Sequence, residues 1–137
     1  MYAVTGGART LGDARSYLAK GPLASYEKFG FGLWLVEAKE SGVAMGMCGL
    51  LQRDVVADVD LGYAFLAEFW SRGYALEAAS AVLSDARVTF GLRRVAAVVS
   101  PDNRSSIRLL EKMGFEYEKM VRLAEDAPES KLFLSDI

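Results

Sequence analysis

Five residues at the start of a long amphipathic segment have the types and spacing of a phosphate-binding turn. They are Ser71, Arg72, Gly73, Tyr74 and Ala75. Backbone N–H groups at a helix N-terminus, together with the positive end of the helix dipole, bind phosphate when the chain can approach closely. Gly73 and Ala75 permit that approach, and Arg72 adds a positive charge. The alternative is that the turn binds no ligand: Ser71 would then cap the helix, and Gly73 would be an ordinary loop residue.

The segments around this turn predict two parallel strands joined by a helix. Residues 59–66 have the composition of a strand and lead into the turn. Downstream of the turn, apolar residues recur at helical spacing and give the helix one buried stripe. Residues 94–99 form a second strand, which is too apolar to have one face in water. Parallel strands joined by a crossover helix are usually buried on both faces in this way. The stripe consists of Leu76, Ala79, Leu83, Ala86 and Phe90.

A second motif follows the second strand. Residues 101–115 contain a turn that begins at Pro101, a helix, and a glycine, Gly114, at which the helix ends. Asn103 lies in the turn, and Ser106 follows it by three residues.

Together, the two motifs resemble the acetyl-CoA site of the GNAT N-acetyltransferase superfamily, most closely the branch of the ribosomal-protein N-terminal alanine and serine acetyltransferases. The phosphate loop of that branch reads aromatic-Trp-Gly-Lys-Gly-Tyr-Ala-x-Glu-Ala, and residues 69–78 depart from it only by Ser71 and Arg72, both mild changes. Its second signature, Asn-x-x-Ser-Ile-x-x-Leu-Glu-Lys-x-Gly-Phe, is matched closely by residues 103–115. Two motifs in the right order make the resemblance specific. A looser similarity extends from about residue 11 to the C-terminus.

The resemblance implies an α/β fold, in the wider sense that includes α+β. Its mixed sheet would have helices on both faces and would be splayed between two central strands, residues 61–66 and 95–100. Thr10 and Asp13 resemble a capping box that opens a helix over residues 11–20. The next two residues, a glycine and a proline, are expected to end that helix before a short turn or helix near residues 23–28. The other expected strands are a hairpin of residues 31–38 and 43–52, and residues 115–122 and 131–135.

The resemblance also implies how acetyl-CoA is held. In the superfamily, the pantetheine arm of the cofactor lies between the splayed strands like an additional strand. Backbone N–H groups near Phe65 and Leu66 would then hold the arm and polarise the thioester carbonyl. Each donor fixed in place before charge develops lowers a barrier by roughly 3 kcal/mol. Asn103 would hydrogen-bond the pantetheine amides, with capping of the helix as its alternative role.

Proton transfer involves three candidate residues. Many superfamily members have a tyrosine proton donor where this chain has Leu110, and leucine cannot donate. In the ribosomal-protein branch, a serine three residues after the asparagine is proposed for this role, and that position is Ser106. The alternative role of Ser106 is a polar contact near the start of the helix. The favoured base is Asp60, where the branch commonly has a glutamate, and Glu68 is second. An exposed acid without a catalytic role is the alternative for both.

Composition excludes several other classes of protein. The chain has 137 residues, of which 52% are hydrophobic, and this predicts a single domain over residues 1–137. The net charge of −2 gives no field that would attract nucleic acid or an anionic membrane. Histidine is absent, which excludes Ser-His-Asp and Cys-His hydrolases and imidazole metal sites. Carboxylates alone could still hold a metal, but Asp54, Asp58 and Asp60 are interpreted as marking a turn and the start of the next strand, so no metal is expected. The single cysteine, Cys48, is expected to be a buried core thiol. No apolar run could span a bilayer and no secretion signal is recognisable, so we expect a cytoplasmic protein.

The N-terminal region departs from the family pattern. GNAT domains normally begin with a strand and a helix before the helix expected at residue 11, and residues 1–8 are too short to supply both. The chain is therefore expected either to be an N-terminally short domain with an open acceptor side or to have that side completed by another subunit. Residues 31–38 would become an apolar sheet edge that loses its cover, which predicts a two-fold homodimer. Local pairing of residues 2–5, which would leave a monomer, is the alternative.

Two functions are compatible with these residues. The first is an N-acetyltransferase that moves the acetyl group of acetyl-CoA directly to a primary amine, either a protein N-terminus or a small amine. The second is a non-catalytic domain of the same fold that binds acyl-CoA or a protein partner. The sequence does not identify the amine, because the loops that bind acceptors carry no transferable signature.

Overall fold

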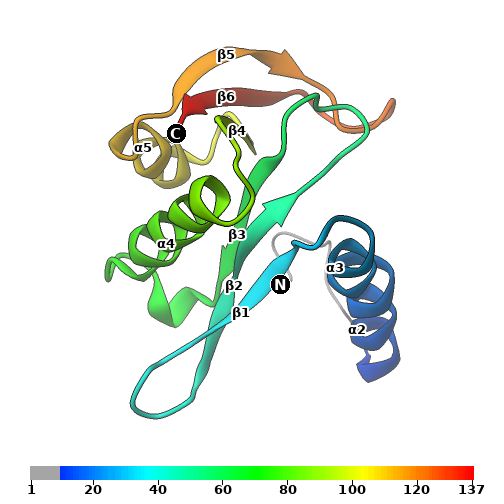
Figure 1. The fold of residues 1–137 in the computed structure, drawn as a ribbon, viewed down its shortest axis with the longest axis vertical. Coiled ribbons are helices and arrows are strands. Elements are labelled where there is room, and N and C mark those ends of the chain that lie inside the picture. Colours follow the sequence, from blue (N-terminus) through cyan, green and yellow to red (C-terminus); the bar gives the residue numbers. More distant parts are fainter. Residues whose placement is uncertain (1–9) are drawn as a thin grey trace. The chain divides into compact units, whose positions relative to one another are not determined.

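The computed structural model describes residues 10–137, which form helices and a sheet of six strands (Figure 1). The helices are α2 (Leu11–Leu18), η1 (Ala19–Leu23), α3 (Ala24–Phe29), η2 (Ala67–Phe69), α4 (Tyr74–Val88) and α5 (Arg104–Lys112). The strands are β1 (Leu33–Glu37), β2 (Ala44–Leu51), β3 (Asp60–Phe65), β4 (Arg94–Val99), β5 (Glu116–Val121) and β6 (Ser130–Asp136). The hydrogen-bonded order is β1-β2-β3-β4-β6-β5, a mixed sheet that confirms the predicted fold class.

The chain divides into two compact units. One contains the residues up to Leu51 together with Gly62–Ala79, and the other contains Gln52–Leu61 and Ser80–Ile137. The first unit therefore holds the hairpin and the predicted phosphate turn. The second unit holds the start of β3, most of α4 and the C-terminal strands. The alternative pairing of residues 2–5 falls outside the described residues.

The first helical segment is longer than the sequence predicts. Thr10 caps α2 as expected, since its Oγ1 accepts a hydrogen bond from the backbone N–H of Asp13 at 3.0 Å. Gly21 and Pro22 do not end the helix, because they lie in the π-helical turn η1, which continues into α3. A π-turn tolerates a proline, which has no N–H to donate. Gly30, with φ of 82°, ends the segment instead.

The strands β1 and β2 form the predicted antiparallel hairpin, with Leu35 opposite Met47. β1 is the outermost strand on its side of the sheet order. Trp34 and Leu35 are 52% and 60% exposed. Phe31 was expected to lose its cover with the rest of residues 31–38, and this was wrong, because its side chain is buried and stacks on Phe29 with 5.5 Å between ring centroids. The exposed part of this edge is therefore shorter than predicted.

Side chains of α3 reach the backbone at the beginning of β1. Ser25 Oγ donates to the carbonyl of Phe31 at 2.6 Å, and the Tyr26 hydroxyl donates to the carbonyl of Leu33. The ring of Tyr26 also contacts Trp34, with 4.9 Å between centroids. The helical segment thus fixes the entry into the hairpin.

The second unit contains the C-terminal strands. β6 pairs antiparallel with β4 and with β5, with Phe133 opposite both Ala97 and Tyr117. β3 pairs parallel with β4 at Asp60 and Ala96, as the β-α-β pattern predicts. Four of the six residues of β4 are buried, which explains why its sequence is apolar throughout after the exposed Arg94.

The helix α4 has the buried stripe that the sequence predicts. Ala79 and Ala86 have no exposed surface, while Leu76 and Leu83 are half-buried. Phe90 lies beyond the end of the helix and is also half-buried. Small residues at the two deepest positions allow α4 to pack closely.

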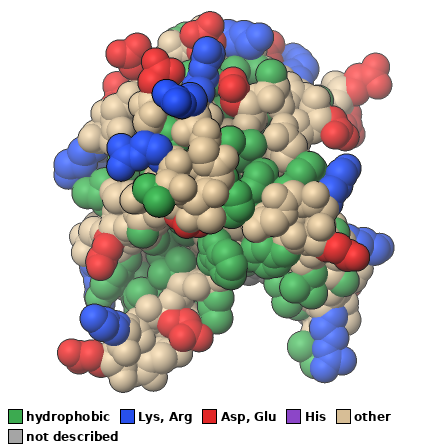
Figure 2. Space-filling model, viewed as in Figure 1, with side chains coloured by type: hydrophobic (Ala, Val, Ile, Leu, Met, Phe, Trp, Pro, Cys, Tyr) green, Lys and Arg blue, Asp and Glu red, His purple; other side chains and the backbone are tan. Residues whose placement is uncertain are grey.

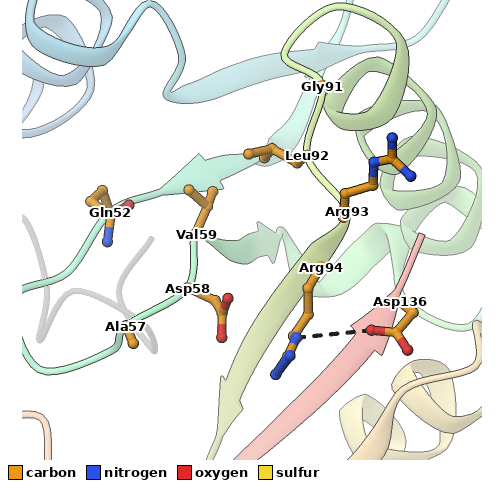
Figure 3. A pocket seen from close by; sticks show the side chains of 9 residues that line it. All are labelled: Gln52, Ala57, Asp58, Val59, Gly91, Leu92, Arg93, Arg94 and Asp136. Atoms are coloured by element: carbon orange, nitrogen blue, oxygen red, sulfur yellow. Dashed lines mark ion pairs between the residues drawn. The ribbon is translucent and has the colours of Figure 1, made fainter.

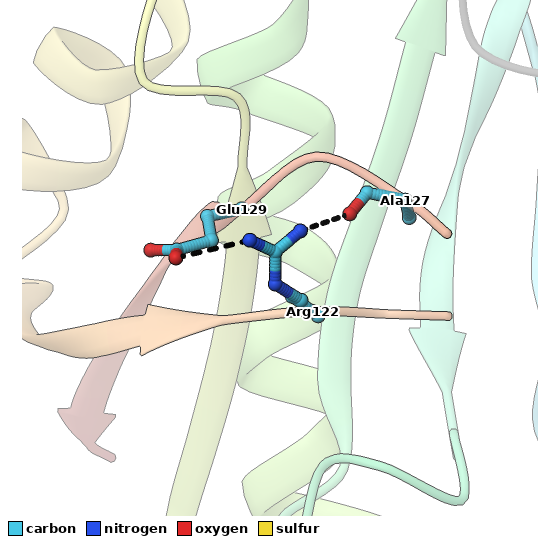
Figure 4. A network of polar contacts seen from close by, with 3 residues as sticks. All are labelled: Arg122, Ala127 and Glu129. Atoms are coloured by element: carbon cyan, nitrogen blue, oxygen red, sulfur yellow. Dashed lines mark hydrogen bonds and ion pairs between the residues drawn. The ribbon is translucent and has the colours of Figure 1, made fainter. Parts of the chain in front are cut away.

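The connection between β5 and β6 is held by an arginine. Arg122 Nη1 donates to the carbonyl of Ala127 at 2.7 Å, and its Nη2 lies 3.3 Å from Oε1 of Glu129 (Figure 4). In the first unit, Cys48 is 1% exposed, and burial raises the pKa of its thiol to about 12. This confirms the prediction that Cys48 is a core thiol, since almost none of it ionises near neutral pH.

The charged side chains on the face in Figure 2 include both signs in mixed positions, in keeping with the small net charge. Within residues 10–137, no helix is long and apolar enough to cross a membrane.

Candidate functional site

The predicted phosphate turn joins η2 to α4 and is exposed. The Gly73 carbonyl accepts a hydrogen bond from the N–H of Glu77 at 3.1 Å, so the helical hydrogen bonds begin at the turn. Gly73 has φ of 83°, and a side chain added there would meet no atom within 4 Å. The glycine therefore presents open space at the N-terminus of a helix of 15 residues, which is the geometry that phosphate binding requires.

Ser71 adopts a left-handed conformation with φ of 60°, the one non-glycine residue among 10–137 with positive φ. A side chain in this region of backbone space costs roughly 1 kcal/mol relative to glycine. The branch that this chain resembles has glycine at the same position. Serine there is thus a larger departure than the sequence indicated, because it adds backbone strain to the turn.

Two aromatic contacts hold the turn in place. The ring of Tyr74 packs edge-on against Phe69, with 6.2 Å between centroids and 72° between planes. The indole Nε1 of Trp70 donates to the carbonyl of Phe65 at 2.8 Å. The Tyr74 ring therefore joins the start of α4 to η2, and Trp70 joins the turn to the end of β3. The role of Trp70 was not predicted from the sequence, although the motif itself contains this tryptophan.

The two backbone donors predicted at the end of β3 differ in their surroundings. The N–H of Leu66 donates to the carbonyl of Met45 on β2 at 2.9 Å. In a trans peptide the C=O and the next N–H point in opposite directions, so the Phe65 carbonyl points away from β2. The N–H of Phe65 points to the same side as its carbonyl, because both groups of a strand residue do. Phe65 is therefore better placed than Leu66 to pair with a ligand.

The second motif forms the capped start of α5. Asn103 Oδ1 accepts hydrogen bonds from the backbone N–H of Ser106 and from Oγ of Ser105, both at 3.2 Å. The capping alternative for Asn103 is thus observed, and its Nδ2 group supplies two further donors. Ser106 is half-buried in the first turn. Leu110 is 1% exposed, so a tyrosine there would overfill the core.

Asp60 is fully buried, which rules out its alternative role as an exposed acid. Its Oδ2 lies 3.2 Å from Nε of Arg53, a side chain that is one-third exposed. Neither carboxylate oxygen makes a hydrogen bond within the described chain. Burial raises the pKa of Asp60 to about 6, and the charge of Arg53 offsets only part of this rise. Nothing in the sequence marks Arg53 as a partner of Asp60, because two opposite charges seven residues apart, one before a strand and one at its start, form no distinctive pattern.

The two candidate bases therefore have complementary properties. The raised pKa suits Asp60 to proton transfer near neutral pH, but its lack of exposed surface prevents direct contact with an amine. Glu68 lies in η2, two residues before Trp70, and is exposed. Glu68 and the phosphate turn belong to the first unit, whereas Asp60, Asn103 and Ser106 belong to the second.

The second unit also contains an open pocket of about 480 Å³ (Figure 3). Arg94 lies across it, with Nε 3.8 Å from Oδ1 of Asp136, and Asp58 and Arg93 also line it. Both signs of charge are present, and none of the predicted site residues contributes to it. Among residues 10–137, no group of three or more Cys, Asp and Glu side chains could hold a metal ion.

Comparisons with known sequences show the family of the chain. Residues 1–116 match the family model described as the acetyltransferase (GNAT) domain. The chain is 38% identical over 92 residues to the N-acetyltransferase YoaA of Bacillus subtilis, covering 65% of this chain and 51% of YoaA. It is 35% identical over 96 residues to YkkB of the same organism, covering 69% of this chain and 56% of YkkB. The chain thus spans about half the length of the curated relatives it matches.

Comparisons with solved structures agree with the fold. An acetyltransferase from Agrobacterium tumefaciens has a TM-score of 0.82 at 26% identity, covering 99% of this chain and 78% of that one. A ribosomal-protein-serine acetyltransferase from Vibrio cholerae has a TM-score of 0.80 at 18% identity, covering 94% and 76%. The family match, the fold and the glycine turn at the start of α4 lead to one conclusion: the chain belongs to the GNAT family of acetyltransferases.

Proposed function

We propose that this chain transfers the acetyl group of acetyl-CoA directly to a primary amine. The observation that carries the proposal is the exposed turn at the start of α4, where Gly73 has positive φ and open space beside it. A pyrophosphate would bind the backbone N–H groups of Gly73, Tyr74 and Ala75, next to Ser71 and the charge of Arg72. The family of the chain supports acetyl-CoA as the co-substrate.

The acetyl group would be held at the end of β3. The N–H of Phe65 would donate to the thioester carbonyl and stabilise the negative charge that develops on its oxygen. Leu66 would contribute by fixing this strand to β2 through its bond to Met45. Asn103 would reach the pantetheine amides through Nδ2 while its Oδ1 caps α5.

The reaction forms a C–N bond and breaks a C–S bond. The neutral amine attacks the thioester carbon, the amine nitrogen loses a proton, and the departing thiolate gains one. We assign proton delivery to the hydroxyl of Ser106. We assign proton removal to Asp60 through water, with Glu68 as the second candidate, because Asp60 has the pKa near neutrality and Glu68 has the access to solvent.

The acceptor would be a protein N-terminus or a small amine. The Vibrio cholerae structure described as a ribosomal-protein-serine acetyltransferase represents the first class, but its 18% identity supports only the fold. We further propose a single domain, a cytoplasmic location and a two-fold homodimer without nucleic acid, membrane or metal partners. Exposed Trp34 and Leu35 on the outermost strand support the dimer.

The alternative is a non-catalytic domain that binds acyl-CoA. Two observations favour it: Asp60 is enclosed, and Leu110 replaces the tyrosine donor of many relatives with a core side chain. Amine-dependent release of free thiol from acetyl-CoA, measured over a panel of amines and N-terminal peptides, separates the two functions. Thiol release that depends on an amine supports the enzyme. Binding of coenzyme A without any such release supports the alternative.

Binding itself is tested by substitution at the turn. Gly73→Val should abolish the thermal stabilisation by coenzyme A, because the side chain fills the space where the pyrophosphate would lie. At roughly 100 times its dissociation constant, a ligand stabilises the native state by about 2.7 kcal/mol, which a melting curve detects readily. Gly42→Val is the matched control: Gly42 also has positive φ and open surroundings, but it lies in the β1–β2 turn. Absence of any shift in the wild type with millimolar coenzyme A would reject the proposal.

A further inference from the structure

Trp70 lies directly before the phosphate turn, and its side chain reaches back to the end of the preceding strand, β3. Its indole Nε1 donates to the carbonyl of Phe65 at 2.8 Å, yet Trp70 is 59% exposed. Water can replace the carbonyl as a partner of an exposed N–H, so this bond exchanges at small net cost. The hydrogen bond between Trp70 and Phe65, which lie on either side of η2, can therefore break and form again.

The carbonyl that Trp70 occupies is the one an extended ligand would use. It points away from β2, because the N–H of the same peptide donates to Met45. A ligand that adds to a strand pairs with both the N–H and the C=O of one residue. Phe65 offers both groups on that side. An extended amide ligand on β3 would therefore meet the indole at the Phe65 carbonyl, which already accepts its N–H.

We propose that Trp70 competes with the pantetheine arm of coenzyme A for the Phe65 carbonyl and thereby sets the affinity for the cofactor. This inference rests on the proposed function, which places the arm along β3. An amide N–H of the arm replaces the indole N–H on the carbonyl, and the indole N–H turns to water. The 3′,5′-ADP portion of coenzyme A carries no such amide, so its binding is independent of Trp70.

The test compares the two ligands by calorimetry. Trp70→Phe keeps an aromatic ring but removes the N–H donor. We expect its dissociation constant for coenzyme A to fall about 2- to 10-fold, the range that corresponds to one ordinary hydrogen bond. The dissociation constant for 3′,5′-ADP should stay the same. Trp34→Phe is the matched control, since Trp34 is 52% exposed and its ring contacts Tyr26 instead. Its dissociation constants for both ligands should equal those of the wild type.

A fluorescence measurement tests the same point without altering Trp70. The chain has two tryptophans, so Trp70 is the sole indole emitter in Trp34→Phe. Its emission should change on addition of coenzyme A and stay constant with 3′,5′-ADP. Equal changes with both ligands, or weaker or unchanged binding of coenzyme A by Trp70→Phe, would overturn the competition. If the wild type binds neither ligand, the proposed function fails as well, which distinguishes that outcome from failure of the Trp70 inference alone.

Discussion

Replacement of Asp60 by asparagine should make the protein more stable at neutral pH. The side chain is fully buried, and its pKa is about 6 in the native state against 3.8 for an ordinary aspartate carboxyl group. The native state therefore binds this proton more tightly than the unfolded state does. The contribution of Asp60 to the free energy of unfolding is therefore fully present below pH 4 and is lost as the pH rises through 6. A difference of about 2 pKa units corresponds to about 3 kcal/mol lost at pH 7.5.

Asp60→Asn removes this loss, because the amide resembles the protonated carboxyl group in shape and is uncharged. Urea unfolding of both proteins from pH 4 to pH 8 measures the effect. The curves of unfolding free energy should nearly coincide at pH 4 and separate by up to about 3 kcal/mol at pH 7.5, with the variant more stable. Asp136→Asn is the control: that carboxylate is exposed and lies 3.8 Å from Arg94, so the change should stay within about 0.5 kcal/mol.

The partner residue gives an independent check of the sign. Arg53→Leu removes the positive charge that lowers the pKa of Asp60, so it should destabilise the protein above pH 6 and have less effect at pH 4. A variant Asp60→Asn that is less stable than the wild type at pH 7.5 would refute the reasoning, because the ion pair would then outweigh the cost of burial. If Asp60 is also the base, the same substitution should lower turnover while it raises stability.

Three further predictions concern the turn, the proton donor and the assembly. Ser71→Gly should raise stability by roughly 1 kcal/mol in thermal or urea unfolding, since it relieves a positive φ of 60°; no gain would show that the turn is unstrained. Ser106→Ala should lower turnover more than it raises the Michaelis constant for acetyl-CoA, because a group that protonates the thiolate acts mainly in the transition state. Unchanged turnover with chemistry rate-limiting would remove Ser106 from the mechanism. Light scattering with size exclusion should give a dimer at tens of micromolar that Leu35→Lys converts to monomer, whereas a stable wild-type monomer would contradict the exposed edge as an interface.

The sequence predicted the elements whose signals are local and strong. The stripe in α4, the apolar strand β4 and the cap at Thr10 are confirmed because periodicity, burial and side-chain chemistry agree there. The predicted end of the first helix was wrong. A glycine and a proline usually stop an α-helix, but here a π-turn accommodates them. Burial of Phe31 was also missed, because its stacking on Phe29 depends on how α3 returns to the hairpin.

The site was predicted less completely than the fold. Motif spacing located the turn around Gly73 and the cap at Asn103, both of which depend on residues close in sequence. The roles of Arg53 and Met45 depend on pairings that only the folded chain brings about. Composition placed Asp60 on a strand, but its depth, and therefore its raised pKa, follows from tertiary packing.

The π-turn η1 has a consequence for how the length of this chain can vary. Each residue of an α-helix adds about 100° of rotation, so the wider turn sets the angular phase of α3 relative to α2. That phase allows Ser25 and Tyr26 to face the backbone carbonyls at the start of β1. Deletion of one residue from Ala19–Leu23 would favour a regular helix yet rotate both side chains away from those carbonyls. Single-residue insertions and deletions should therefore be tolerated less well here than in the exposed turn between β1 and β2.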